Sequence, residues 1–265
     1  MFGASLFGRQ MQKSFRGHIA QLTNCGARFA VMAAVCGCAS SGVTQMSPAA
    51  AASGSYDVII ANGRVVDGTG NLWYYADVAI RGDRIALVAP PHALDGATAA
   101  RRIDARGLVV TPGFIDMQGQ SAESFVHGDG RAISKITQGV TSEILGEGDT
   151  PAPANANVFA SASPGDSAMT RAMHSFGGEH GFGAWLDEMQ NHGVSVNVGS
   201  YLGAETVRIY AMGSAPGAPP VAQLATMRRV VRDAMRDGAF GVASALIYPP
   251  GSYAGTPELI EMSRA

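Results

Sequence analysis

One stretch decides how this chain folds: Val110-Thr111-Pro112-Gly113-Phe114-Ile115-Asp116-Met117-Gln118-Gly119-Gln120. It predicts an apolar strand that ends at a cluster of polar side chains. Because successive side chains of a strand point to opposite faces, Gln118 and Gln120 are expected on the same side of it. The stretch therefore places two amide side chains together at the carboxyl end of a strand.

The composition indicates a folded α/β chain. The sequence has 265 residues, of which 46% are hydrophobic and 15% are charged, and its net charge is −2. This is enough apolar material for one large domain or two smaller ones. Many of the 34 glycines lie near the ends of apolar runs, as in a turn-rich α/β protein. No basic block with interleaved aromatic residues points to nucleic acid.

The N-terminal segment, residues 1–38, has the layout of a signal peptide. Basic residues without any acidic one precede an apolar run at 29–35, which is shorter than the roughly 20 residues needed to span a bilayer. Small residues then lead to Cys38 and are followed by Ala-Ser-Ser, an order that resembles a bacterial lipoprotein cleavage site. This predicts lipidation of Cys38 and export of the protein. The exported protein would be periplasmic or would be attached to a membrane through the lipid anchor alone.

Alternatives exist for this leader. An ordinary secretory signal could be cleaved near the alanines at 49–52, and Met11 is an alternative start of the chain. Residues 39–54 are rich in Ala, Ser and Gly and predict a flexible tether. All three cysteines precede the tether, so no disulfide framework and no cysteine metal site is expected in the rest of the chain.

Residues 55–109 predict a small antiparallel sheet. Short strand-like runs are separated by turn signals, among them Asn62-Gly63 and Arg81-Gly82-Asp83. Asp67 and Asp104 lie beside such turns, and turn chemistry explains these two carboxylates better than catalysis does. This segment leads directly into the strand that carries the two glutamines.

Residues 110–265 predict alternating strands and helices, with an irregular insertion at 147–180. Further strands are expected at 141–146, 194–202 and 239–248, and helices at 134–138, 183–192, 220–237 and from Thr256 onward. Such alternation implies parallel strands and right-handed crossovers. A (β/α)8 barrel needs eight strands and roughly 250 residues, so four units indicate the first half of a barrel. A self-sufficient four-unit α/β domain is the alternative, with open strand edges.

Several phrases of the sequence resemble one known family. They are DVIIANGRVVDGTG at 57–70, the exit PGFID at 112–116, ITQGVTSEILGEGDTPAP at 136–153, VSVNVGSYLGAETVRIYAMG at 194–213 and GAFGVASALIYPPGSYAGTPELIEM at 238–262. Together they resemble the N-acyl-D-amino-acid deacylases, or D-aminoacylases, of the amidohydrolase superfamily, over nearly all of residues 56–265. The resemblance implies an α/β fold of the amidohydrolase type, a β-sandwich segment at 55–109 followed by the first half of a (β/α)8 TIM barrel at 110–265.

The same resemblance implies a hydrolase that acts on carbon–nitrogen bonds other than peptide bonds. Its substrate would be a small N-acyl amino acid or a dipeptide-like molecule, and its products a D-amino acid and a carboxylate. It also implies zinc, which in the family activates water and polarises the carbonyl group. The alternative is a catalytically inactive exported binding protein on the same scaffold. The 265-residue product alone is expected to be inactive, and no catalytic residue is assigned.

The metal-binding histidine pair of the family corresponds to Gln118 and Gln120 in this chain. A neutral amide oxygen is a much poorer zinc ligand than imidazole. Three alternatives follow for the pair. The two glutamines could form a weak metal site, or they could be hydrogen-bonding groups that face the substrate, with Gln120 as a substrate contact. They could also mark the loss of this metal position.

Other site positions follow from the resemblance. The family's metal-ligating cysteine corresponds to Gly148, which has no side chain to offer. Glu147 is the preferred substitute ligand, Asp149 is the other, and an acid that merely satisfies the turn is the alternative. Tyr248 matches a tyrosine that lines the substrate site, which implies a hydrogen bond from its phenol, while a rim aromatic is the structural alternative. His127 is expected to be a loop histidine.

Overall fold

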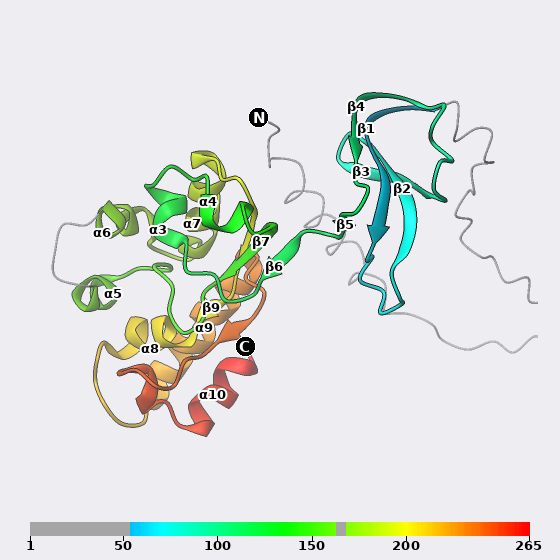
Figure 1. Cartoon of the computed structure of the whole chain (residues 1–265). Helices are drawn as coiled ribbons and strands as arrows, with labels where there is room; N and C mark the ends of the chain where they lie inside the picture. Colours follow the sequence, from blue (N-terminus) through cyan, green and yellow to red (C-terminus); the bar gives the residue numbers. More distant parts are fainter. Residues whose placement is uncertain (1–53, 163–167) are drawn as a thin grey trace, which may run out of the picture. The chain divides into compact units, whose positions relative to one another are not determined.

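The computed structural model describes residues 54–162 and 168–265 (Figure 1). The described residues divide into two compact units, with the boundary between Pro112 and Gly113. The predicted signal peptide, the lipidation of Cys38 and residues 39–53 of the tether lie outside the described residues. Within the described residues, no helix combines the length and the apolar character that a membrane-crossing segment requires.

The first unit is a sheet of five strands. In chain order these are β1 (Ser55–Val65), β2 (Tyr74–Arg81), β3 (Arg84–Ala89), β4 (Thr98–Asp104) and β5 (Val109–Val110). The order in the sheet is β3-β2-β1-β4, and β5 also pairs with β1. The strands β1, β2 and β3 are antiparallel, whereas β4 and β5 run parallel to β1. The prediction of a purely antiparallel sheet was therefore wrong, because the long connection after β3 returns the chain to the other edge of β1.

The predicted turn at Asn62-Gly63 is instead an irregularity inside β1. The pairing of β1 with β2 shifts register between Ile60 and Gly63, and Asn62 has a φ of 64°. Its backbone N–H turns aside and donates to the Asp77 carboxylate at 2.9 Å. Asparagine tolerates this backbone conformation, so Asn62 makes a bulge and the strand continues.

The second unit contains parallel strands that follow chain order. The strands β6 (Phe114–Asp116), β7 (Val140–Leu145) and β8 (Asn197–Ser200) form one sheet in that order, and β9 (Leu202–Gly203) pairs with β10 (Val242–Ala243). Every one of these pairings is parallel. Only Tyr201 separates β8 from β9, and the Phe240 N–H donates to the Ser200 carbonyl at 3.0 Å, so β10 follows β8 and β9 as the next neighbour. The prediction of successive parallel strands is confirmed.

Two predicted segments differ from the structure. The fourth strand was expected over 239–248 but contains only Val242 and Ala243, because the chain leaves the sheet at Ser244 and turns into the 3-10 helix η2 (Gly251–Tyr253). The insertion at 147–180 is not irregular, since it contains α5 (Ala156–Ser161), α6 (Ala168–Met173) and the 3-10 helix η1 (His174–Phe176). The side chain of Asn155 caps α5 by accepting the Val158 N–H at 3.1 Å.

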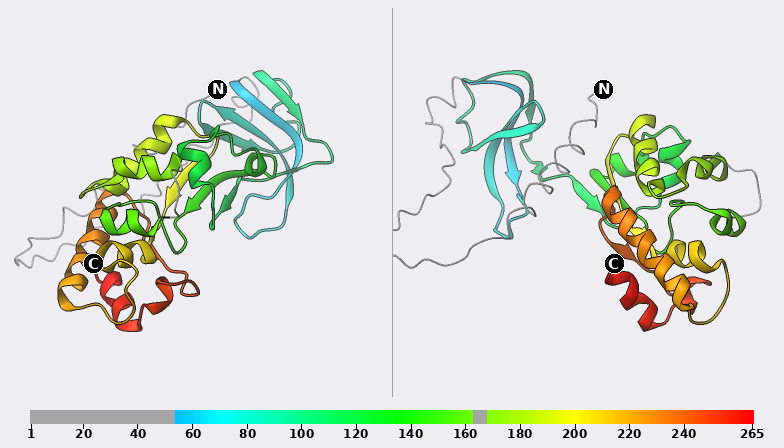
Figure 2. Two further views of the ribbon diagram at one scale, coloured as in Figure 1. Left: turned by 90° about the vertical axis from the view of Figure 1, so that its left-hand side faces the viewer. Right: turned by 180° about the vertical axis from the view of Figure 1, so that it is seen from behind.

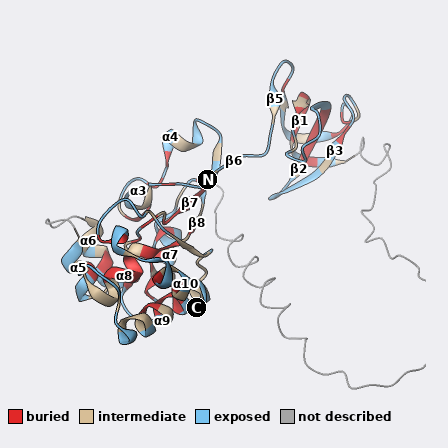
Figure 3. Cartoon of the chain, turned by 90° about the horizontal axis from the view of Figure 1, so that it is seen from below, coloured by how far each residue is buried: buried red, intermediate tan, exposed pale blue. Residues whose placement is uncertain are grey.

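Helices cover the parallel strands. They are α3 (Ala122–Val126), α4 (Ile133–Ile136), α7 (Gly181–His192), α8 (Ala204–Met212), α9 (Val221–Asp237) and α10 (Thr256–Ser263). The long helix α9 lies beside α8 and α10 (Figure 2). It buries Met227, Val230, Val231 and Ala234 on one face, and it ends at Gly238 with a φ of 109°. Buried residues are concentrated between these helices and the strands (Figure 3), which fixes the strand ends described below.

Candidate active site at the strand ends

The neighbouring strands β6 and β7 present two carboxylates to one lysine. Asp116 on β6 lies opposite Glu143 on β7. The Lys135 ammonium group, on α4, donates to the Asp116 carboxylate and lies 3.9 Å from Oε1 of Glu143. This hydrogen bond from Lys135 holds the pKa of Asp116 below its ordinary value, and Asp116 in turn raises the pKa of Lys135. The helix α4, which precedes β7, is thereby tied to both strands.

Glu143 supports the turn that follows β6. Its side chain is fully buried, and its Oε1 accepts the backbone N–H of Ser121 at 3.1 Å. Gly119 lies directly on this carboxylate, since a Cβ at position 119 would be 2.2 Å from Cγ of Glu143. Its N–H donates to the Ile144 carbonyl at 2.8 Å. The spacer between Gln118 and Gln120 is therefore glycine because a carboxylate occupies the space of its side chain.

Gln118 and Glu147 meet across the ends of β6 and β7. The side-chain amide of Gln118 donates to Oε2 of Glu147. Gly146 and Gly148, which flank Glu147, have φ values of 87° and 83°, a left-handed backbone that glycine adopts without strain. The turn after β7 thus directs Glu147 toward the turn after β6, and the two predicted residues are in direct contact.

Gln120 and Tyr248 do not join this contact. Both side chains are exposed, Tyr248 with 64% of its surface accessible. In the described part of the chain, neither side chain forms a hydrogen bond with Gln118 or Glu147. The backbone carbonyl of Tyr248 accepts the Ser252 N–H at 2.8 Å, within the turn that follows β10. The structure therefore brings together two of the four predicted site residues.

A second pair of carboxylates lies at the ends of β7 and β9. The Glu205 N–H, at the start of α8, donates to the Gly148 carbonyl at 2.9 Å, beside Asp149. Burial raises the pKa of Asp149, although the residue as a whole keeps an exposed surface. Burial also raises the pKa of Glu205, and the negative charge of Asp149 adds to this. Both carboxyl groups therefore hold a proton more tightly than a free carboxyl does.

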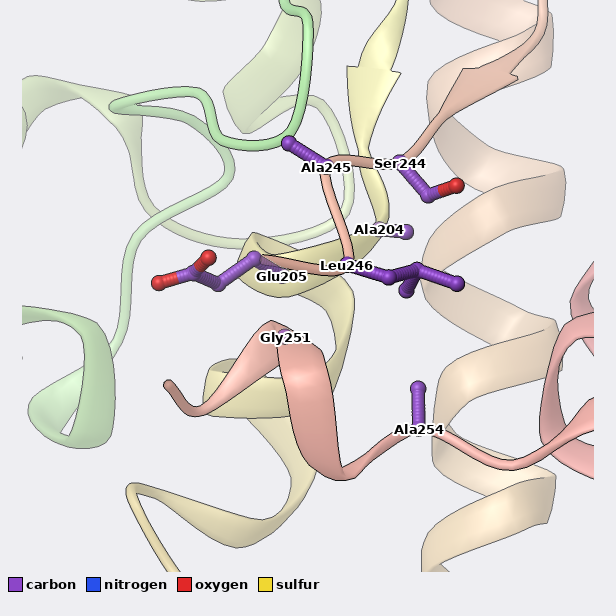
Figure 4. Close-up of a pocket in the computed structure, with 7 residues that line it drawn as sticks. All are labelled: Ala204, Glu205, Ser244, Ala245, Leu246, Gly251 and Ala254. Carbon is purple, nitrogen blue, oxygen red and sulfur yellow. The ribbon is translucent and has the colours of Figure 1, made fainter. Parts of the chain in front are cut away.

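Glu205 is one of the residues that line a small pocket (Figure 4). The pocket is lined by Ala204, Glu205, Ser244, Ala245, Leu246, Gly251 and Ala254. Glu205 and Ser244 supply its polar side chains, and none of Gln118, Gln120, Glu147 and Tyr248 lines it. The sequence patterns did not indicate Glu205 as a site residue. Its position could have indicated this, because Glu205 follows the third strand at the edge where parallel strands place their functional groups.

The described residues do not supply a zinc site. Within residues 54–162 and 168–265, no group of three or more His, Cys, Asp or Glu side chains is arranged to hold a metal ion. Around Gln118 the available donors are amides and the Glu147 carboxylate, whereas zinc takes imidazole, thiolate and carboxylate. Three of the described histidines have other contacts: His180 with Asp237 at 2.8 Å, His192 with the Gly128 carbonyl at 2.7 Å and His174 stacked on Phe159.

Comparison with solved structures identifies the fold as the amidohydrolase type. A structure of D-aminoacylase, reported for its binuclear metal centre, has a TM-score of 0.66 and 33% identity, with 79% of this chain and 42% of that chain covered. N-acyl-D-glutamate deacylase from Bordetella bronchiseptica, complexed with zinc and a phosphonate inhibitor, has a TM-score of 0.67 and 29% identity over the same shares. The expectation of zinc thus agrees with solved structures of this fold.

Proteins of similar sequence narrow the class of amidohydrolase that this chain resembles. N-acyl-D-glutamate deacylase from Alcaligenes xylosoxydans xylosoxydans is 35% identical over 212 residues, which cover 78% of this chain and 41% of the relative. D-aminoacylase from the same organism is 34% identical over 217 residues, 79% of this chain and 42% of the relative. No protein-family model matches. The chain is homologous to the N-acyl-D-amino-acid deacylases of the amidohydrolase superfamily, as predicted, and spans about two fifths of the length of the relatives it matches.

Proposed function

We propose that the protein with this sequence hydrolyses carbon–nitrogen bonds other than peptide bonds, and that its substrate is a small N-acyl-D-amino acid. The products are a D-amino acid and a carboxylate. Support comes from relatives named for this activity, at 35% and 34% identity. The Gln118–Glu147 contact at the carboxyl ends of two parallel strands carries the proposal, because active sites of barrel folds lie at that edge.

Glu147 is proposed as the proton acceptor. A water molecule adds its oxygen to the acyl carbon while its proton passes to the Glu147 carboxylate. The same proton then passes to the amine nitrogen as the carbon–nitrogen bond breaks. Gln118 holds the carboxylate in one orientation for both transfers. Since the donors at these strand ends do not fit zinc, the transfers are assigned to Glu147 alone.

Substrate contacts are proposed for Gln120 and Tyr248. Both side chains are exposed, and each follows the end of a parallel strand. The Gln120 amide and the Tyr248 phenol can each donate a hydrogen bond to a carboxylate or acyl oxygen. Loss of such a contact raises KM more than it lowers kcat if the contact is equally strong in substrate and transition state.

The test is an assay of the full-length protein for release of free D-amino acid. N-acetyl-D-glutamate, N-acetyl-D-aspartate and N-acetyl-D-leucine are compared with their L-enantiomers. Glu147→Gln should lower kcat by about 10²- to 10⁴-fold, the usual contribution of a general base. Tyr248→Phe should mainly raise KM. Stoichiometric binding of these compounds without any release would instead favour the binding-protein alternative.

Export and lipid anchoring are proposed separately. They rest on the order of basic, apolar and small residues before Cys38. Expressed in a bacterium, the protein should enter the membrane fraction and carry a diacylglyceryl group on Cys38, and Cys38→Ser should release it. Cleavage near residues 49–52 in the mature protein would show an ordinary secretory signal instead.

A further inference from the structure

We infer that Gln118 and Glu147 are partners of each other and not ligands of a metal, so the ends of β6 and β7 bind no zinc in this chain. The amide side chains at 118 and 120 disfavour the metal, while hydrogen bonds that do not involve these side chains hold the backbone of the turn. The inference rests on family membership and the described geometry. It holds whether or not the protein hydrolyses amides.

The first argument is the chemistry of the pair. Gln118 uses its amide N–H as a donor to the Glu147 carboxylate. To bind a metal, Gln118 would have to present its amide oxygen, a neutral and weak ligand for zinc, and its N–H would lose the hydrogen bond to Glu147. The contact therefore satisfies Glu147 without a cation. The absence of any group of three metal-ligating side chains among residues 54–162 and 168–265 agrees with this.

The second argument is the backbone. The turn after β6 is fixed by three hydrogen bonds that do not involve the side chains of Gln118 or Gln120. The Gln118 N–H donates to Asp116 at 3.1 Å, the Gly119 N–H to the Ile144 carbonyl at 2.8 Å and the Ser121 N–H to Glu143 at 3.1 Å. Substitution at 118 or 120 leaves all three in place.

The third argument is space. Gln118 and Gln120 are both exposed, so imidazole rings at these positions meet no packed core. A histidine at 118 would lie beside Glu147, because the side chain at this position already contacts that carboxylate. Two histidines and one glutamate form one of the ligand sets that bind zinc with an open fourth position. Gln120 makes no hydrogen bond with Glu147 among the described residues, so zinc binding also requires a histidine at 120 to turn toward this carboxylate.

The test compares zinc binding of the full chain, untagged and with all three leader cysteines replaced by serine, with that of its variants. Zinc per chain is measured by atomic emission after dialysis, and affinity by competition with a chromophoric chelator. The parent should retain no zinc at these strand ends. The double variant Gln118→His/Gln120→His should retain about one zinc ion per chain. Glu147→Gln in that background should weaken the binding, because it removes the third ligand.

Two results would overturn the inference. One is stoichiometric zinc in the parent that Gln118→Ala or Glu147→Gln removes. The other is a double-histidine variant with an unchanged circular dichroism spectrum that takes up no zinc, since the backbone would then not present the positions together. Zinc in the parent that survives both substitutions is bound elsewhere and supports the inference. Failure of the proposed activity appears separately, as absence of D-amino acid release.

Discussion

Arg208 on α8 and Glu258 on α10 form a buried ion pair, with Nη1 of the arginine 2.5 Å from Oε2 of the glutamate. Their side chains have only 0% and 1% of their surface exposed. The second guanidinium nitrogen donates to the carbonyl groups of Ala215 at 3.0 Å and Gly217 at 2.6 Å. This arginine therefore connects α8 both to the loop that precedes α9 and to the helix α10.

Removal of one member of this pair should be severely destabilising. Glu258→Leu leaves a buried guanidinium without its counter-charge, and we expect the free energy of unfolding to fall by about 3–5 kcal/mol. The double variant Arg208→Met/Glu258→Leu removes both charges and should lose much less. Urea denaturation monitored by circular dichroism measures both. Arg264→Ala, which breaks an exposed pair with Glu261, is the control and should cost less than about 1 kcal/mol. Equal losses for single and double variants would contradict the prediction.

The Lys135–Asp116 pair should make stability depend on acid pH. The pKa of Asp116 is lowered in the folded state, mainly by the hydrogen bond from Lys135. The ionised carboxylate therefore stabilises the fold above the pKa of an unfolded aspartate, about 3.9, and this contribution is lost as the pH falls through the lower folded-state pKa. Lys135→Met should reduce stability at pH 7, with a difference from the parent that shrinks toward pH 3. A difference independent of pH would rule out this linkage.

Glu205→Gln should stabilise the protein at neutral pH. Burial, followed by the charge of Asp149, raises the pKa of Glu205 in the folded state. A carboxyl group with a raised folded-state pKa contributes stability below its unfolded pKa, about 4.3, and loses it as the pH rises through the folded-state value. Removing the charge should therefore raise the melting temperature at pH 7 and leave it unchanged near pH 3.5. Glu179→Gln, at an exposed position, is the control and should change neither value. A lower melting temperature at pH 7 would refute the assignment.

Gly203→Ala should disrupt the contact between β9 and the turn after β7. A Cβ at position 203 would lie 2.4 Å from Cα of Asp149 and 2.6 Å from the Gly148 carbonyl oxygen, and neither backbone atom can move freely. We expect a loss of about 1–3 kcal/mol, as for other overpacked sites. Gly255→Ala, where the nearest atom is 3.6 Å away, is the matched control. Equal denaturation midpoints for the two variants would contradict the close approach.

Much of the second unit could be predicted from local patterns. Apolar runs that end at glycine or at polar residues identify β6 and β7, and the spacing of apolar residues identifies α9, whose bounds differ by one residue from those expected. Contact between Gln118 and Glu147 was foreseeable because parallel strands carry their carboxyl ends to one edge. These features depend on periodicity, which a single sequence displays.

Features that depend on tertiary packing could not be predicted. The helices α5 and α6 have six residues each, too few for a clear amphipathic period, and they form because Val158 and Met173 enter the core. Glu143 and Arg208 are charged residues in buried positions, which composition argues against. Gln120 and Tyr248 share strand-end locations with Gln118, but the direction of a turn decides whether their side chains converge, and the turn after β10 is not specified by periodicity.

The carboxylate beneath Gly119 couples a position in the turn after β6 to a position on β7, so that the residue allowed at one depends on the residue at the other. Any side chain at residue 119 collides with residue 143 while that residue is glutamate. Among homologous sequences, a larger residue between the two strand-end side chains should therefore occur together with a smaller residue at position 143. The pair would then change in concert during evolution, and neither member would be free to drift alone.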